Sequence, residues 1–318
     1  MTVRAVLPLA VLIAAVIGPG VRAQTAEKAR FSASFDADAI WKDFERLASS
    51  DLEGRQTGSE GNRTARRLIT ERFGQGGLVP LAQDFHMPFR FTRQDAEQEG
   101  VNVVGLCRGT KPDDRRAIVV SAHYDHVGIR NGKTYPGADD NASGTTALIA
   151  LAGLCQKSPW QHDIVFAAFD AEEQGLQGAR AFVAAPPIPK ARIALNINMD
   201  MVSRSAAREI YIAGTRYRPE LRKLLDGVAR RSAAHVRFGH DDPKGKGGAH
   251  DDWTMQSDHG PFHMAGIPFL YFGVEDHPDY HEPTDTIDKI DAAFFFHVVA
   301  TILDALNTLD RTLPAAAQ

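Results

Sequence analysis

Acidic and imidazole side chains follow several apolar or glycine-bounded stretches of this sequence. Those with the chemistry of metal ligands are His123, Asp125, Asp139, Asp140, Asp170, Glu172, Glu173, Asp200 and His281. Two imidazoles among several carboxylates suit Zn²⁺. Burying so many like charges together is costly unless a cation neutralises them. The pattern therefore predicts a metal centre.

The spacing of these residues also predicts their roles. Asp125 is close enough to His123 to accept the second ring N–H of that imidazole and fix its tautomer. Adjacent Glu172 and Glu173 point different ways, so one can hold a metal while the other acts on a substrate as a general base. The expected ligands are His123 and Asp200 on one ion, Glu173 and His281 on a second, and Asp139 across both. Two ions so held would lie about 3.5 to 4 Å apart, as in two-metal hydrolases.

The elements that must position these residues are short apolar runs separated by helical stretches. This alternation predicts βαβ units in one α/β domain, with a mixed, mostly parallel sheet flanked by helices. The expected strands are residues 101–106, 117–121, 164–169, 194–198, 209–212 and 268–272, and the expected helices are 144–155, 178–184, 219–233, 260–265 and 292–309, with two more helical stripes within 36–73. Ligands bind beyond the carboxyl ends of such strands, where the acids and imidazoles lie. Residues 239–248 show neither helical nor strand periodicity, which predicts a loop.

Composition excludes several classes of protein. The 318 residues are 43% hydrophobic with a mean hydropathy of -0.26, which does not suit a polytopic membrane protein. A formal charge of -4 with no long basic run argues against nucleic-acid binding. Two cysteines cannot build a disulfide-dense scaffold or a cysteine-only zinc site.

The first 23 residues have the pattern of a secretory leader. Arg4 precedes an apolar run over residues 5–17, and Ala23 ends a small-residue cleavage pattern. The run is too short to span a membrane, so we expect export to the periplasm or medium, with no stable membrane association after cleavage. In that oxidising environment Cys107 and Cys155 would form a disulfide or remain two buried thiols, and the spacing leaves both open.

The ordered motifs resemble those of the co-catalytic dizinc aminopeptidases, a family that includes secreted bacterial leucyl-type enzymes and, more distantly, glutamate carboxypeptidases and animal-type glutaminyl cyclases. The motifs that carry the resemblance are residues 123–125, 137–144, 170–175, 198–201 and 281–286. The similarity extends from about residue 47 to residue 291, nearly the whole predicted mature chain of residues 24–318.

The resemblance implies a zinc-peptidase α/β/α sandwich without the protease-associated insert that many relatives carry. It also implies two Zn²⁺ per chain, with Asp139 bridging, Glu172 as the general base and Asp125 supporting His123. The implied ligands are His123, Asp139, Glu173, Asp200 and His281. The implied reaction removes the N-terminal residue of a peptide with a free amino group by attack of a water shared by the metals.

Five further histidines and one acid carry weaker predictions. Asp258 and His259 lie in a segment similar to one near the family's active site, so they are candidates for contact with substrate. The other histidines considered, His126, His250, His263 and His277, are expected to be loop or surface residues.

Three alternatives remain open. A glutaminyl cyclase uses a single zinc, and that branch typically replaces the second acid of the Asp139–Asp140 pair, which is intact here. A carboxypeptidase for acidic C-terminal residues would need arginines to hold two carboxylates, and no obvious cluster is present. A zinc-binding or peptide-binding module without catalysis would have no need of Glu172. A serine hydrolase is poorly supported, because no Gly-x-Ser-x-Gly segment occurs.

Overall fold

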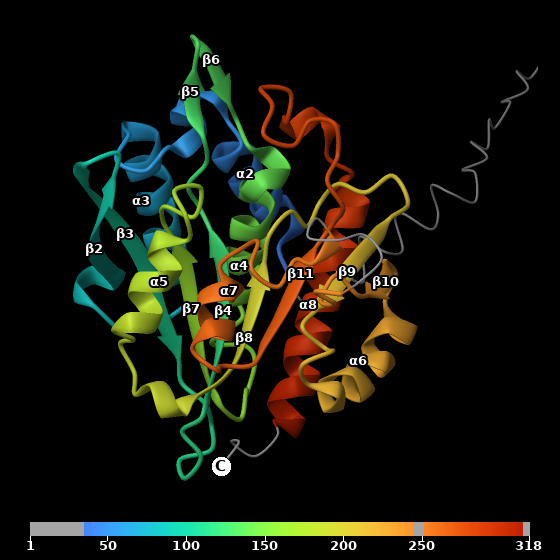
Figure 1. The fold of residues 1–318 in the computed structure, drawn as a ribbon. Helices are drawn as coiled ribbons and strands as arrows, with labels where there is room; N and C mark the ends of the chain where they lie inside the picture. Colours follow the sequence, from blue (N-terminus) through green and yellow to red (C-terminus); the bar gives the residue numbers. More distant parts are fainter. Residues whose placement is uncertain (1–34, 245–250, 314–318) are drawn as a thin grey trace, which may run out of the picture.

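The apolar runs form the middle of a nine-stranded sheet in the computed structural model, which describes residues 35–244 and 251–313 (Figure 1). The strand order is β1-β3-β7-β4-β8-β11-β9-β10, and β2 pairs with β3. The strands are β1 Val79–Pro80, β2 His86–Arg93, β3 Ala96–Cys107, β4 Ala117–His123, β7 Asp163–Phe169, β8 Ile193–Met199, β9 Glu209–Ala213, β10 His235–Phe238 and β11 Phe269–Gly273. A separate hairpin joins β5 (Gly128–Arg130) to β6 (Lys133–Tyr135).

The four central strands β7, β4, β8 and β11 run parallel, with Val119 of β4 level with Val165 on one side and Asn196 on the other. Antiparallel pairs flank them, because β3 pairs with β7 and β9 pairs with β11. Every residue of β4 and of β7 is buried, as expected where helices cover both faces of a sheet. The predicted mixed, mostly parallel sheet between helices is confirmed.

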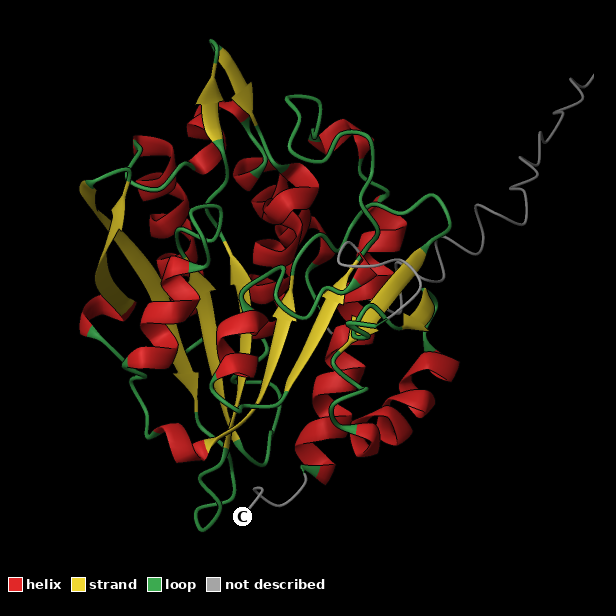
Figure 2. Cartoon of the chain, viewed as in Figure 1, coloured by secondary structure: helices red, strands yellow, loops and turns green. Residues whose placement is uncertain are grey.

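Helices cover the two faces unequally (Figures 1 and 2). The larger apolar core packs five helices against one face: α2 (Ala37–Leu47), α3 (Glu60–Gln75), α4 (Gly144–Ala152), α6 (Pro219–Arg231) and α8 (Ala292–Thr312). A smaller core joins the other face to α5 (Gln177–Ala184) and α7 (His259–Met264), through Phe182 and Phe262. Helix α8 is long and apolar enough to cross a membrane, but half of its most apolar window is buried within this fold.

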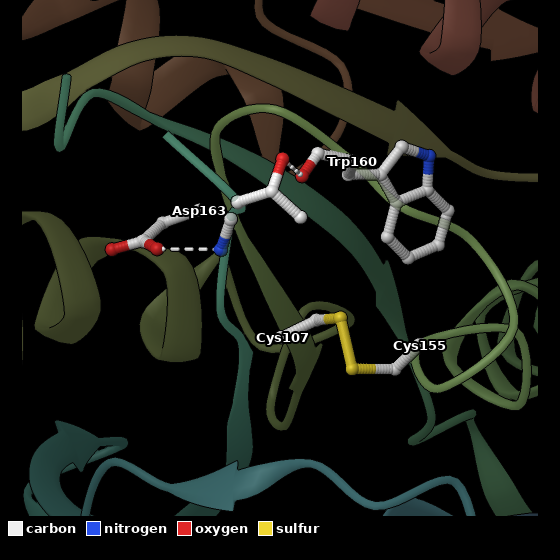
Figure 3. The surroundings of a disulfide bond; sticks show 6 residues. Cys107, Cys155, Trp160 and Asp163 are labelled. Carbon is white, nitrogen blue, oxygen red and sulfur yellow. Dashed lines mark hydrogen bonds between the residues drawn. A yellow bond between two sulfur atoms is a disulfide. The ribbon is translucent and has the colours of Figure 1, made fainter. Parts of the chain in front are cut away.

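A disulfide links the end of β3 to the turn after α4 (Figure 3). Cys107 and Cys155 are 48 residues apart in sequence. Nearby, the backbone N–H of Gly109 donates to Asp163 and the hydroxyl of Thr110 donates to the carbonyl of Trp160. Of the two possibilities that the sequence left open, the structure has the disulfide.

The six predicted strands are all present, and so are the five helices for which residue ranges were predicted, with ends shifted by a few residues. The structure adds β1, β2, β10 and the β5–β6 hairpin, which the sequence pattern did not predict. The predicted leader, residues 1–23, lies outside the described residues, as do residues 245–250 of the predicted loop.

Candidate metal centre

The predicted ligands come together at the carboxyl ends of the central strands. His123 is the last residue of β4 and is level with Phe169, the last residue of the neighbouring β7. Glu172 and Glu173 follow β7, and Asp200 follows β8. Parallel neighbours end at the same edge, so these side chains arrive together.

One group of possible ligand atoms consists of His123, Glu172 and Asp200, all within 4.8 Å of one another. The Nε2 atom of His123 lies 3.2 Å from Oδ1 of Asp200. His123 and Asp200 are buried, whereas Glu172 is partly exposed. The predicted pairing of His123 with Asp200 is therefore reproduced in space.

A second group consists of His126, Asp140, Glu173 and His281, again within 4.8 Å. Nε2 of His281 lies 3.0 Å from Oδ2 of Asp140 and 3.2 Å from Oε1 of Glu173. The predicted pairing of Glu173 with His281 is thus also reproduced. His126, expected to be a loop or surface histidine, is instead buried in this group.

The carboxylate of Asp140 lies between the two groups. Its Oδ1 atom is 3.4 Å from Nε2 of His123, and its Oδ2 atom is 3.0 Å from Nε2 of His281. One oxygen therefore faces each imidazole, which is the position predicted for Asp139.

Asp139 belongs to neither group. Its Oδ1 atom accepts hydrogen bonds from the backbone N–H and the hydroxyl of Ser203, and its Oδ2 atom lies 3.2 Å from Nε2 of His277. The structure places Asp140 between the two groups, one residue after the predicted Asp139. The cause is local: the backbone at Asp140 leaves helical geometry (φ -104°, ψ 98°), so the two adjacent carboxylates point in different directions.

The two adjacent glutamates separate as predicted, one into each group. Ala171 before them has a left-handed backbone (φ 58°), and the backbone N–H groups of Glu172 and Glu173 donate to the two oxygens of Asp125 at 3.0 and 3.3 Å. Nδ1 of His123 lies closer to the backbone oxygen of Asp125, at 3.2 Å, than to its carboxylate, at 3.7 Å. Asp125 therefore supports both glutamates as well as the histidine.

A second buried carboxylate supports the turn that carries Asp139 and Asp140. Asp285 accepts the backbone N–H of Asp139 at 3.0 Å and of Asp140 at 3.1 Å. The same turn is held by Arg55, whose fully buried guanidinium donates to four carbonyl oxygens. These belong to Leu47, Tyr124, Pro136 and Gly137.

Burial and neighbouring charges set the protonation of the site. Burial raises the pKa of the Glu172 carboxyl well above its usual value; His123 opposes the rise, whereas Asp200 adds to it. Burial lowers the pKa of His281, but Asp140 and Glu173 outweigh it and raise that pKa to about 10. Protons therefore partly neutralise the cluster, and a cation that binds here must displace the proton of His281.

The separations between ligand atoms are at or slightly below those that zinc requires. Tetrahedral zinc with nitrogen and oxygen ligands at 2.0–2.2 Å places neighbouring ligand atoms about 3.3 to 3.6 Å apart. The pairs His123–Asp140, His123–Asp200, His281–Asp140 and His281–Glu173 lie 3.4, 3.2, 3.0 and 3.2 Å apart. Oε1 of Glu173 is also buried without a hydrogen-bond partner in the described part of the chain. A small divalent cation would satisfy that atom.

The two candidate substrate contacts differ. Asp258 is fully buried, and neither of its carboxylate oxygens has a hydrogen-bond partner among the residues described. Burial raises the pKa of Asp258 well above its usual value, and Asp125 and Asp200 add to the rise against the opposing charge of His123. His259 is buried with Nε2 2.8 Å from the carbonyl oxygen of Trp253 and its ring stacked on Phe269, while its Nδ1 has no hydrogen-bond partner among the residues described.

Comparisons with known proteins agree with this fold, an α/β/α sandwich with two groups of residues that could hold metal ions. The family model of peptidase family M28 matches residues 102–306, so the chain belongs to that family. The predicted resemblance is confirmed at this level.

Among curated relatives, "Aminopeptidase YwaD" of Bacillus subtilis is 32% identical over 218 residues, which are 63% of this chain and 42% of that protein. A "Probable leucine aminopeptidase" of Arthroderma otae is 29% identical over 191 residues, 56% of this chain and 50% of that protein. The chain thus spans half or less of the length of these relatives.

Solved structures share the fold at low identity. "Aminopeptidase from Aneurinibacillus sp. strain AM-1" has a TM-score of 0.71 at 16% identity, covering 86% of this chain and 94% of that chain. The glutaminyl cyclase of Porphyromonas gingivalis has a TM-score of 0.70 at 19% identity, covering 88% and 99%. Enzymes of two kinds therefore share this fold, and the site must distinguish between them.

Proposed function

We propose that the protein is an exported zinc-dependent exopeptidase that hydrolyses the N-terminal residue of peptides and holds two zinc ions per chain. One observation carries the proposal: the two oxygens of Asp140 face two separate groups of metal-type ligands. Membership of a peptidase family and the zinc aminopeptidase from Bacillus subtilis among its structural neighbours support the choice of metal and reaction.

In this proposal His123 and Asp200 hold one ion, Glu173 and His281 hold the other, and Asp140 is shared. Zinc at such a site lowers the pKa of a water and polarises the substrate carbonyl. Asp139 passes from the ligand set to a supporting role, because its carboxylate contacts Ser203 and His277 instead.

Glu172 is the proposed general base. It belongs to the His123 group but does not link the two groups, and it is partly exposed, so a substrate can reach it. Its raised pKa lets it accept a proton and later donate that proton to the leaving amine. Two cations nearby would lower this pKa again, toward the range where a base works near neutral pH.

Asp258 is the proposed contact for the free amino group of the substrate. Its buried, unpartnered carboxyl is close enough to Glu172 to raise the pKa of that group. An ammonium group beside Asp258 would favour its ionised form and supply the missing hydrogen bonds. His259 has no such role in this proposal.

Residues 1–23 are proposed as the leader that directs export to the periplasm or medium. The disulfide between Cys107 and Cys155 supports this, because disulfides persist in oxidising compartments.

Hydrolysis is favoured over cyclisation because of Asp140. The family resemblance implies a single zinc for a cyclase, whereas the two oxygens of Asp140 face two separate ligand groups here. The acidic-dipeptide carboxypeptidase and the non-enzymatic binding module have no specific observation in their favour.

The test is release of leucine from a short leucyl peptide, alongside an N-acetylated copy of the same peptide. Cleavage of the free-amine peptide alone, lost on chelation and restored by zinc, is the expected result. Cleavage of neither peptide would contradict the proposal. An N-terminal glutamine peptide and a peptide with acidic C-terminal residues then distinguish the cyclase and the carboxypeptidase.

A further inference from the structure

His126 is a buried histidine in the site for which the proposed ligand set has no use. It follows β4 by three residues, and its side chain is fully enclosed. Its Nδ1 atom lies 2.7 Å from Oε1 of Glu173 and 3.6 Å from Oδ2 of Asp140. These two oxygens are also the ones that face Nε2 of His281.

The surroundings of His126 leave its ring nitrogens unsatisfied. Neither nitrogen has a hydrogen-bond partner among the described residues, and the close contact of Nδ1 is the 2.7 Å ion-pair distance to Oε1 of Glu173. Buried polar atoms are nearly always paired, so an unpaired imidazole beside an unpaired carboxylate oxygen needs an explanation. A cation between them would pair both at once.

Four ligand atoms converge on one point in this group. The four separations that join Nδ1 of His126 and Nε2 of His281 to the two carboxylate oxygens run from 2.7 to 3.6 Å. Tetrahedral zinc requires about 3.3 to 3.6 Å, so a small expansion around the ion accommodates all four.

The turn before Asp140 makes room for this imidazole. A Cβ atom added at Gly137 would lie 2.4 Å from Cδ2 of His126, and Gly137 has a left-handed backbone (φ 58°). Only glycine meets both requirements without strain. The same turn thus carries Asp140 and leaves the space that the His126 ring occupies.

We propose that His126 is a fourth protein ligand of the ion held by Asp140, Glu173 and His281. The two metal sites are then unequal: this site has four protein ligands, whereas the other has His123, Asp140 and Asp200. The four-ligand site binds zinc more tightly and fills first, and the three-ligand site keeps an open position for reacting groups. This inference rests on the proposed two-zinc function.

The first test compares zinc affinities of the metal-free protein by competition with a chelating dye. His126→Gln removes the donor at the Nδ1 position, whereas His126→Asn places an oxygen close to it. We expect the tighter of the two sites to weaken by more than about 100-fold in His126→Gln and by less in His126→Asn. His162→Gln is the matched control, because His162 is equally buried but bonds Asp114 and Asp310 outside both groups.

Equal zinc affinity in wild type and His126→Gln would overturn the proposal, as would equal weakening in His126→Gln and His162→Gln. Circular dichroism checks that each variant is folded. If His126→Gln does not fold, the zinc affinity of His126→Asn still tests the proposal.

The second test counts imidazoles directly, by zinc K-edge X-ray absorption on protein loaded with one equivalent of zinc. Two imidazoles on the ion in wild type and one in His126→Gln are expected. One imidazole in both would show that His126 only supports Glu173. Failure of the proposed function is separate, since wild type would then bind no zinc or cleave no peptide, whatever His126 does.

Discussion

Two pairs of adjacent acids, Asp139–Asp140 and Glu172–Glu173, lie at the site, and their side chains are directed differently. Both glutamates reach the site, one in each ligand group. Of the aspartates only Asp140 does, while Asp139 turns to Ser203 and His277.

The two pairs are nevertheless held in the same way. A buried carboxylate accepts both backbone N–H groups of each pair: Asp125 beneath the glutamates and Asp285 beneath the aspartates. The backbone is fixed alike, so the difference lies in the local dihedral angles, which aim each side chain. Adjacent acids in a sequence therefore do not share a role, and each pair supplies its own test.

The largest effect is expected from the aspartate pair. Asp140→Asn should reduce activity by about 10³-fold or more and weaken both ions, because it removes a charge shared by both groups. Asp139→Asn should retain two ions, with a smaller loss of activity. Zinc analysis after dialysis and the leucyl peptide assay measure both. Two ions in Asp140→Asn and fewer in Asp139→Asn would reverse the assignment.

The glutamate pair should separate chemistry from metal binding. Glu172→Gln is expected to lower kcat by about 10²- to 10⁴-fold with zinc content unchanged, because it removes a general base. Glu173→Gln is expected to lose one ion. Steady-state kinetics and zinc analysis on the same preparations distinguish the two, and a fully active Glu172→Gln enzyme would exclude the proposed base.

The contribution of Asp285, which supports the aspartate pair, should appear in the pH dependence of the free energy of unfolding. Burial and the charge of Asp139 raise the pKa of Asp285 to about 6 from 3.8. Between about pH 4 and pH 6 the folded protein keeps a proton that the unfolded chain has lost. The free energy of unfolding of the metal-free protein should therefore fall by about 3 kcal/mol as pH rises through this interval.

Asp285→Asn should lose that slope and should be closest to the wild type in stability at low pH, where the wild-type carboxyl is also uncharged. Urea unfolding of both proteins at pH 4, 5, 6 and 7 gives the comparison. A slope that is the same in the variant would mean that Asp285 is not the group responsible.

The disulfide lies outside both acid pairs, so its removal should leave activity at 25 °C nearly unchanged. The double variant Cys107→Ser, Cys155→Ser should lose about 2 to 4 kcal/mol of unfolding free energy, because the bond closes a loop between residues 48 apart. Thermal unfolding measures the loss. A large fall in activity without a fall in stability would link this region to the site.

The central strands could be predicted because each is an apolar run buried on both faces, as in β4 and β7. Strand β2 could not, because Arg90 and Pro88 interrupt its apolar residues and only one of its eight residues is buried at the sheet edge. Strand β10 has four residues, none fully buried, and so gives little periodic signal.

The position of the site was predictable from acids and imidazoles at strand ends, but its detailed assignment was not. The choice between Asp139 and Asp140 depends on the backbone dihedral angles at Asp140. His126 is buried, and His277 partly buried, through contacts with residues distant in sequence, such as Glu173 and Asp139. The one available signal was the presence of His126 three residues after His123, at a strand end that already carried a predicted ligand.

Diffraction from zinc-loaded crystals at the zinc absorption edge tests the central claim most directly. We predict two anomalous peaks per chain, on opposite sides of the Asp140 carboxylate, one contacting His123 and Asp200 and the other contacting Glu173 and His281. A single peak, or a peak bound by the Asp139 carboxylate, would contradict this account.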